Sequence, residues 1–183
     1  YLGPRAGEPD GGLASGIPSG LGYSVALHAL LAGVGMFLFL SRRSAGPGRT
    51  PLPFFASLLG AISFALSSFL VVRVRHVIFV QMMAWLPFLM AAIDDYVATR
   101  RRRSLALCAL FTGLLLLSGA HSILHFAALL LAAYAGAALA SSSLGQPRGQ
   151  RLRFAFTVGG ALLFAALLGA LLGAVALAPT LSA

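Results

Sequence analysis

The sequence predicts an all-α fold, a polytopic bundle of membrane-spanning helices. Of the 183 residues, 59% are hydrophobic and 9% are charged, whereas a soluble domain averages about 25% charged residues. The charged residues are unevenly spread, so that long stretches of the chain carry none of them. These stretches are continuously apolar and lack the alternation of β-barrel strands. They therefore favour helices, which satisfy their own backbone hydrogen bonds in lipid.

Charge-free runs delimit about six expected spans, because a helix needs ~20 mostly apolar residues to cross a ~30 Å hydrocarbon core. The run from Ser104 to Pro147 has 44 residues and would be roughly 66 Å long as one helix. It must fold back, and the polar break Ser118–Ser122 marks the turn. The expected spans are 21–40, 52–72, 77–93, 104–118, 122–140 and 154–178.

The basic residues predict the orientation of this bundle. All 13 of them are arginine, against 4 acidic residues, for a net charge of +9. Ten arginines fall in the alternate connections 41–51, 94–103 and 141–153, and three fall on the other side. Since positive residues favour the cytoplasmic side, the charge indicates topology. A soluble nucleic-acid binder is excluded because the chain has too little polar surface, and membrane lipid is the expected partner.

The N-terminal residues 1–20 are expected to form an external loop, since they contain six glycines and three prolines. Residues 21–183 then form a multi-pass bundle in a plasma membrane. The chain starts without a methionine and stops directly after an apolar helix. We therefore expect it to be part of a longer protein.

Arg73, Arg75 and His76 form the turn between the second and third expected spans, on the predicted outer face. Positive charge is disfavoured on this side, so its presence needs a reason. The planar donor fork of arginine matches phosphate oxygens, and the turn is therefore a candidate phosphate clamp. An ordinary interfacial turn, with its arginines on lipid headgroups, is the alternative.

Several polar residues lie inside the expected spans, where they commonly face a protein interior or a wet cavity. His121 and His125 share a helix face, but a zinc site needs further ligands, so no metal site is expected. We expect both histidines to line an external polar cavity. His28 and Gln81, in the outer halves of their spans, would converge on the same pocket. Alternatively, each bonds a neighbouring helix.

The four acidic residues fall into two pairs. Glu8 and Asp10 are predicted outside, where a carboxylate can act as a general base or bind a metal. In a Gly/Pro-rich loop such residues are more often simply solvated. Asp94 and Asp95 precede four arginines and are expected in an exposed, salt-bridged loop. Because P-loop, HExxH and GxSxG motifs are absent, the sequence shows no catalytic centre by itself.

Two glycines in the last expected span, Gly169 and Gly173, match the small-xxx-small pattern of closely packed membrane helices. In a span rich in glycine and alanine this match indicates packing alone.

The order of loose motifs resembles the YfhO-type bacterial membrane proteins, relatives of the GT-C superfamily of polyprenyl-phosphate-dependent glycosyltransferases. The resemblance covers about residues 20–180. It rests on five segments in order, namely Ala26–Met36, Leu59–Phe69 running into Arg73 and His76, Trp85–Pro87, Leu117–His121, and Ala178–Thr180.

This resemblance implies transfer of a sugar from a polyprenyl-phosphate donor to a cell-envelope glycan or polymer, on the outer face of the bacterial plasma membrane. The catalytic Asp of that superfamily lies in an external loop after an initial helix that this chain lacks. The catalytic residue is therefore expected upstream, with Glu8 and Asp10 as remnants of the loop. Arg73, His76 and His121 are the positions carried over to the donor side.

A divalent cation is a candidate cofactor of the full-length enzyme, and no other cofactor is expected. Two rival functions stay open on the sequence. One is a multi-span transporter whose histidines line the substrate path, and the other is a non-catalytic membrane scaffold.

Overall fold

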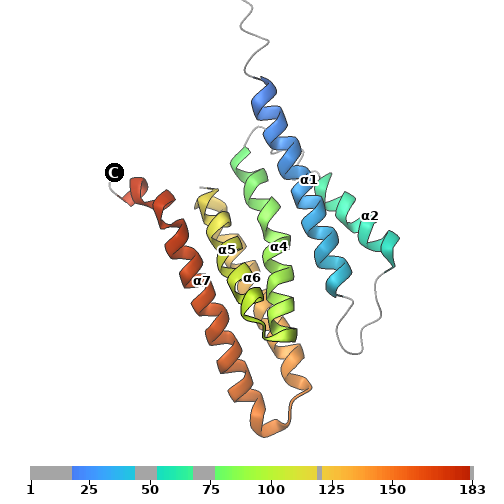
Figure 1. Cartoon of the computed structure of the whole chain (residues 1–183), viewed down its shortest axis with the longest axis vertical. Coiled ribbons are helices and arrows are strands. Elements are labelled where there is room, and N and C mark those ends of the chain that lie inside the picture. Colours follow the sequence, from blue (N-terminus) through green and yellow to red (C-terminus); the bar gives the residue numbers. More distant parts are fainter. Residues whose placement is uncertain (1–17, 44–52, 68–76, 119–120, 182–183) are drawn as a thin grey trace, which may run out of the picture.

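The computed structural model describes residues 18–43, 53–67, 77–118 and 121–181, and every element in these ranges is a helix (Figure 1). The prediction of an all-α chain is confirmed for this part of the molecule. The elements in order are α1 (Pro18–Arg43), α2 (Phe54–Ala65), α4 (Val77–Thr99), α5 (Arg102–Leu117), α6 (His121–Leu144), a short 3₁₀ turn η2 (Arg148–Gln150), and α7 (Arg151–Leu181).

The helices alternate in direction along the bundle (Figure 1). Helices α1, α4 and α6 run one way, and α2, α5 and α7 run the other. The C-terminal ends of α1, α4 and α6 therefore share one end of the molecule, which is where the three arginine-rich connections begin. We call this the arginine end, and the other the histidine end.

Among the residues that the structure describes, four helices are long and apolar enough to cross a membrane, namely Gly22–Arg42, Val77–Thr99, Leu124–Leu144 and Arg151–Ala174. The second expected span, 52–72, is shorter in the structure, because α2 ends at Ala65. There the amides of Leu66 and Ser67 bond the carbonyls of Ile62 and Phe64 and close the last turn. Helix α5 has 16 residues, about 24 Å. A count of six complete spans therefore stays a prediction.

The fold-back within the run 104–147 is confirmed. Helix α5 ends at Leu117 and α6 begins at His121. Ser118 closes α5, since its hydroxyl donates to the Leu115 carbonyl at 2.6 Å. The polar break in the sequence therefore marks a real turn between two antiparallel helices.

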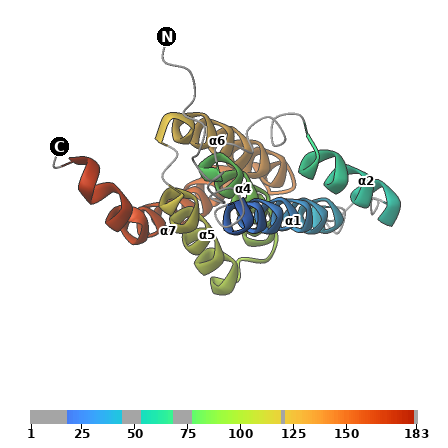
Figure 2. The ribbon, with the colours of Figure 1, turned by 90° about the horizontal axis from the view of Figure 1, so that it is seen from above.

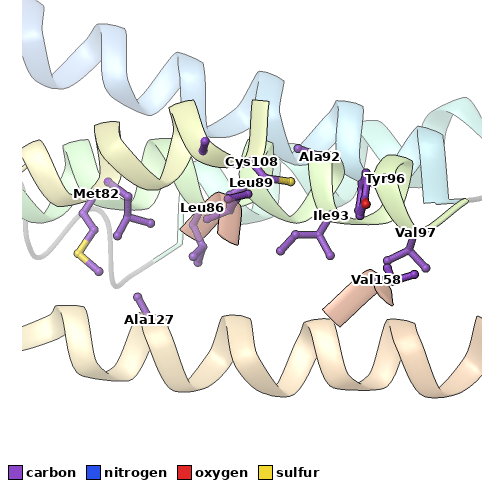
Figure 3. Packing of buried hydrophobic residues seen from close by; sticks show 13 residues of the cluster. Met82, Leu86, Leu89, Ala92, Ile93, Tyr96, Val97, Cys108, Ala127 and Val158 are labelled. Carbon is purple, nitrogen blue, oxygen red and sulfur yellow. The ribbon is translucent and has the colours of Figure 1, made fainter. Parts of the chain in front are cut away.

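Helix α4 is the centre of the bundle, as the view from above shows (Figure 2). It packs against α1, α5 and α6, while α2 covers α1 and α7 covers α5 and α6. Half of the residues in the most apolar window of α4 are buried, compared with 6% in α6. The main core joins Met82, Leu86 and Leu89 of α4 to Cys108 of α5, Ala127 of α6 and Val158 of α7 (Figure 3).

The outward faces of α6 and α7 are apolar. Phe126 and Leu129 of α6 are about as exposed as Phe156 and Leu171 of α7, each close to 70%. A soluble protein rarely exposes so much contiguous apolar surface, and hydrocarbon is a suitable solvent for it. The exposed faces thus support a membrane location for the bundle.

Glycines let α5 and α7 approach closely. A Cβ on Gly169 would lie 2.5 Å from the Ala109 carbonyl oxygen, and one on Gly173 would lie 2.6 Å from Leu116 Cβ. On the facing helix, a Cβ on Gly113 would lie 3.2 Å from the Gly169 carbonyl oxygen. The packing role predicted for Gly169 and Gly173 is confirmed, and Gly113 completes it from the other side.

Candidate functional site

The helices that carry the expected donor-side residues all begin on the side of the histidine end (Figure 1). His28 lies in α1, Gln81 lies in the second turn of α4, and His121 is the first residue of α6. Five other candidates, Glu8, Asp10, Arg73, Arg75 and His76, lie outside the described residues. The last three fall in the segment that joins α2 to α4.

His28 is half-buried and has one ring nitrogen engaged. Its Nδ1 lies 2.7 Å from the carbonyl oxygen of Ser24, one turn earlier in α1. A carbonyl oxygen can only accept, so Nδ1 carries the proton of this bond. In the neutral ring, Nε2 is then left as an acceptor for an external donor such as a hydroxyl group.

Gln81 is also half-buried, and it makes no hydrogen bond within the described ranges 18–43, 53–67, 77–118 and 121–181. Its neighbour Val80 packs with Ala84 of α4 and Ala32 of α1 in a small buried cluster. Ala32 is one turn from His28, so this cluster sets α1 against α4 just below the two polar residues. An imidazole acceptor and a carboxamide are thereby held on adjacent helices.

The role of His125 in an external cavity stays a prediction. Its side chain is exposed on α6, whereas Ala127 of the same turn lies in the core and Leu124 packs against it. The reason is helix phase, because Ala127 is the residue of this stretch that α6 buries. Within the described part of the chain, no group of three or more His, Cys, Asp or Glu residues is placed to hold a metal ion.

The corner between α4 and α5, at the arginine end, differs from the expected exposed loop. Asp94 and Asp95 are half-buried, and no ion pair joins either of them to an arginine of the described ranges. The buried hydroxyl of Ser104, in the first turn of α5, donates instead to the carboxylate of Asp95. One carboxylate oxygen of Asp94 is buried without a hydrogen-bond partner. The prediction of an exposed, salt-bridged loop was therefore wrong.

Arg100 links the α4–α5 corner to α7 through a contact with an aromatic ring. Its backbone is left-handed, with φ 59°, and its amide donates to the Tyr96 carbonyl at 2.9 Å, which ends α4. Its guanidinium carbon lies 4.3 Å from the ring centre of Phe154 in α7 and 5.8 Å from that of Tyr96. Burial lowers the pKa of Arg100, against a smaller opposite effect from Tyr96. The arginine is held by aromatic faces rather than by a carboxylate.

Sequence reasoning missed this role of Arg100. Left-handed residues that follow a helix are usually glycine or asparagine, so an arginine gave no signal of a helix end. Arg100 is half-buried, whereas Arg101, Arg102 and Arg103 are exposed. In the sequence the four arginines are consecutive, so nothing distinguishes the first from the others.

Models of protein families, curated proteins and solved structures all give no match to the chain.

Proposed function

We propose that this chain is part of an integral membrane glycosyltransferase of the GT-C type, which transfers a sugar from a polyprenyl-phosphate donor to a cell-envelope acceptor on the outer face of the bacterial plasma membrane. The observation that supports this proposal is the common direction of the helices that carry the polar candidates. His28, Gln81 and His121 belong to α1, α4 and α6, which all begin on the histidine side of an apolar bundle. Helix α2 ends and α4 begins on that side too, and Arg73, Arg75 and His76 lie between them in the sequence.

The chemistry of the proposed reaction fits these residue types. The acceptor hydroxyl attacks the sugar C1, the bond from C1 to the phosphate oxygen breaks, and the polyprenyl phosphate leaves with added negative charge. Arg73 and Arg75 would neutralise that charge with their guanidinium groups. His76 and His121 would donate hydrogen bonds to the donor. His28, with Nε2 as acceptor, and Gln81 would bind sugar hydroxyls.

The proton of the acceptor hydroxyl requires a general base. A carboxylate upstream of this chain fills that role in the proposal. Glu8 and Asp10, which the sequence predicts in the same external loop, are not assigned the role themselves.

The test uses the full-length protein reconstituted in liposomes with a panel of labelled polyprenyl-phosphate sugars. The measurement is the release of polyprenyl phosphate and the appearance of label on an acceptor. Loss of one preorganised charge partner commonly costs about 100-fold in rate, so we expect Arg73→Ala to lose about that much. Arg42→Ala removes an exposed arginine at the arginine end and should keep the wild-type rate.

Two results would count against the proposal. Transfer at the wild-type rate by Arg73→Ala would remove the phosphate role of this residue. Failure to consume any donor of the panel, together with passage of a solute across the liposome membrane, would favour the transporter instead.

A further inference from the structure

Four arginines form an exposed patch at the arginine end. Arg102 and Arg103 start α5, Arg101 directly precedes it as its N-cap, and Arg153 lies in the first turn of α7. All four are exposed, and we call them the arginine patch. The contact between Arg100 and the Phe154 ring, at 4.3 Å, brings the two helix starts together. Three members of the patch follow Arg100 directly and the fourth precedes Phe154.

No carboxylate neutralises the arginine patch within the described part of the chain. Asp94 and Asp95, the two acidic residues of that part, are half-buried. Asp95 accepts the hydroxyl of Ser104, and a carboxylate oxygen of Asp94 is buried. Arg151 is not a member of the patch, because its guanidinium donates to the carbonyls of Gln146 and Leu144 at the end of α6. The patch therefore carries uncompensated positive charge.

Apolar side chains adjoin the patch on α7. Leu152 is 69% exposed and Phe156 is 72% exposed, on either side of Arg153 in the sequence. The apolar stretches Val77–Thr99 and Arg151–Ala174 both have an end here. The patch thus lies where an apolar helix surface gives way to charge, at the level of the phosphate groups of a bilayer.

We propose that the arginine patch binds the phosphate headgroups of anionic phospholipids in the adjoining leaflet. Guanidinium groups match phosphate oxygens in geometry and charge. The exposed Leu152 and Phe156 contact the acyl chains of the same lipids, which free phosphate lacks. This combination selects a lipid over a soluble anion, and it is independent of the catalytic proposal for the histidine end.

The experiment measures how strongly the purified protein binds phosphatidylglycerol relative to phosphatidylcholine, in nanodiscs of both lipids with a fluorescent phosphatidylglycerol as the probe. Each arginine at an anionic surface changes affinity about fivefold. The double variant Arg102→Gln, Arg103→Gln should therefore bind the probe about 30-fold more weakly. Arg102→Lys with Arg103→Lys keeps the charge and should retain most of the binding. Circular dichroism of each variant tests that it folds.

The matched control is Arg42→Gln with Arg43→Gln, which removes two charges from the same end of the bundle but from α1. Because Arg42 and Arg43 lie outside the arginine patch, this variant should weaken probe binding much less than Arg102→Gln with Arg103→Gln does. Equal losses in the two glutamine doubles would overturn the proposal, because binding would then follow net charge alone. It would also be overturned by a wild-type protein without preference for phosphatidylglycerol, or by displacement of the probe with inorganic phosphate.

Discussion

Replacement of Gly169 by alanine tests the close approach of α5 and α7. The added Cβ would lie 2.5 Å from the Ala109 carbonyl oxygen and 2.6 Å from Thr112 Cβ. Thr112 cannot easily turn away, because its hydroxyl donates to the Cys108 carbonyl at 2.8 Å. The Ala109 contact is with backbone, so the two helices must separate locally.

The expected loss follows from the size of that separation. Restoring an ordinary contact distance of about 3.4 Å requires a shift of about 0.9 Å, which forfeits a quarter or more of the dispersion energy across the gap. With about 40 atom pairs at about 0.15 kcal/mol each, the loss is about 1.5 kcal/mol. This loss lies within the roughly 1–3 kcal/mol by which overpacking usually destabilises a core.

The assay is reversible unfolding of the detergent-solubilised protein by dodecyl sulfate, followed by circular dichroism and by the fluorescence of Trp85. This single tryptophan of the chain stacks on Phe111 of α5 at 6.3 Å between ring centres, so it reports on the packing of α5. Gly160→Ala is the control, since a Cβ at that position of α7 meets nothing within 4 Å.

The two variants should change stability in opposite directions. Alanine favours a helix over glycine by up to about 1 kcal/mol, so Gly160→Ala should be neutral or slightly stabilising. Gly169→Ala should unfold at lower denaturant despite the same gain. Equal unfolding midpoints for Gly169→Ala and Gly160→Ala would refute the close-packing argument.

Two further variants test the corner at the arginine end. Ser104→Ala leaves the Asp95 carboxylate without its donor and should lower the free energy of unfolding by about 2 kcal/mol. Ser141→Ala removes an exposed hydroxyl that bonds its own helix and should have no effect in the same titration. Phe154→Leu removes the ring over Arg100 and should cost about 1 kcal/mol. Phe156→Leu, on an exposed ring of the same helix, should cost less, and equal costs would contradict the Arg100 contact.

The helices follow from the sequence to a large extent, because hydrocarbon imposes long charge-free segments that can be read directly. The turn before His121 was predictable, since a charge-free run of 44 residues is about twice as long as one membrane span. The early end of α2 at Ala65 was not, because residues 66–72 are as apolar as the helix itself. Hydropathy does not distinguish a helical residue from an apolar residue in a turn.

The corner between α4 and α5 shows where sequence reasoning fails. Two aspartates before four arginines indicate ion pairs by charge alone. The partner of Asp95 is instead Ser104, nine residues away and brought back by the turn at Arg100. The left-handed backbone of Arg100 turns the chain so that these contacts form. Charge and hydropathy do not reveal that backbone conformation.

The common direction of the helices that carry the candidate residues was predictable from the sequence, and the site itself stays a prediction. The hydrogen bond that fixes the tautomer of His28 was not predictable, because a serine carbonyl one turn earlier is present in any helix. The exposure of His125 was missed for a related reason. The helix phase of α6 depends on which side of it meets α4, and apolar residues surround the whole helix.

The central position of α4 has a consequence for the order in which the bundle assembles. In the chain, α4 follows α1, the helix that it packs against most, and precedes its other two main partners, α5 and α6, so it is synthesised before those two exist. Its apolar side chains are well solvated by lipid before the later helices pack against them, since lipid tails are as apolar as the later core. Asp95 is different, because its donor Ser104 arrives with α5. The α4–α5 corner can therefore form only once α5 has been synthesised, and its contact with Phe154 must wait for α7.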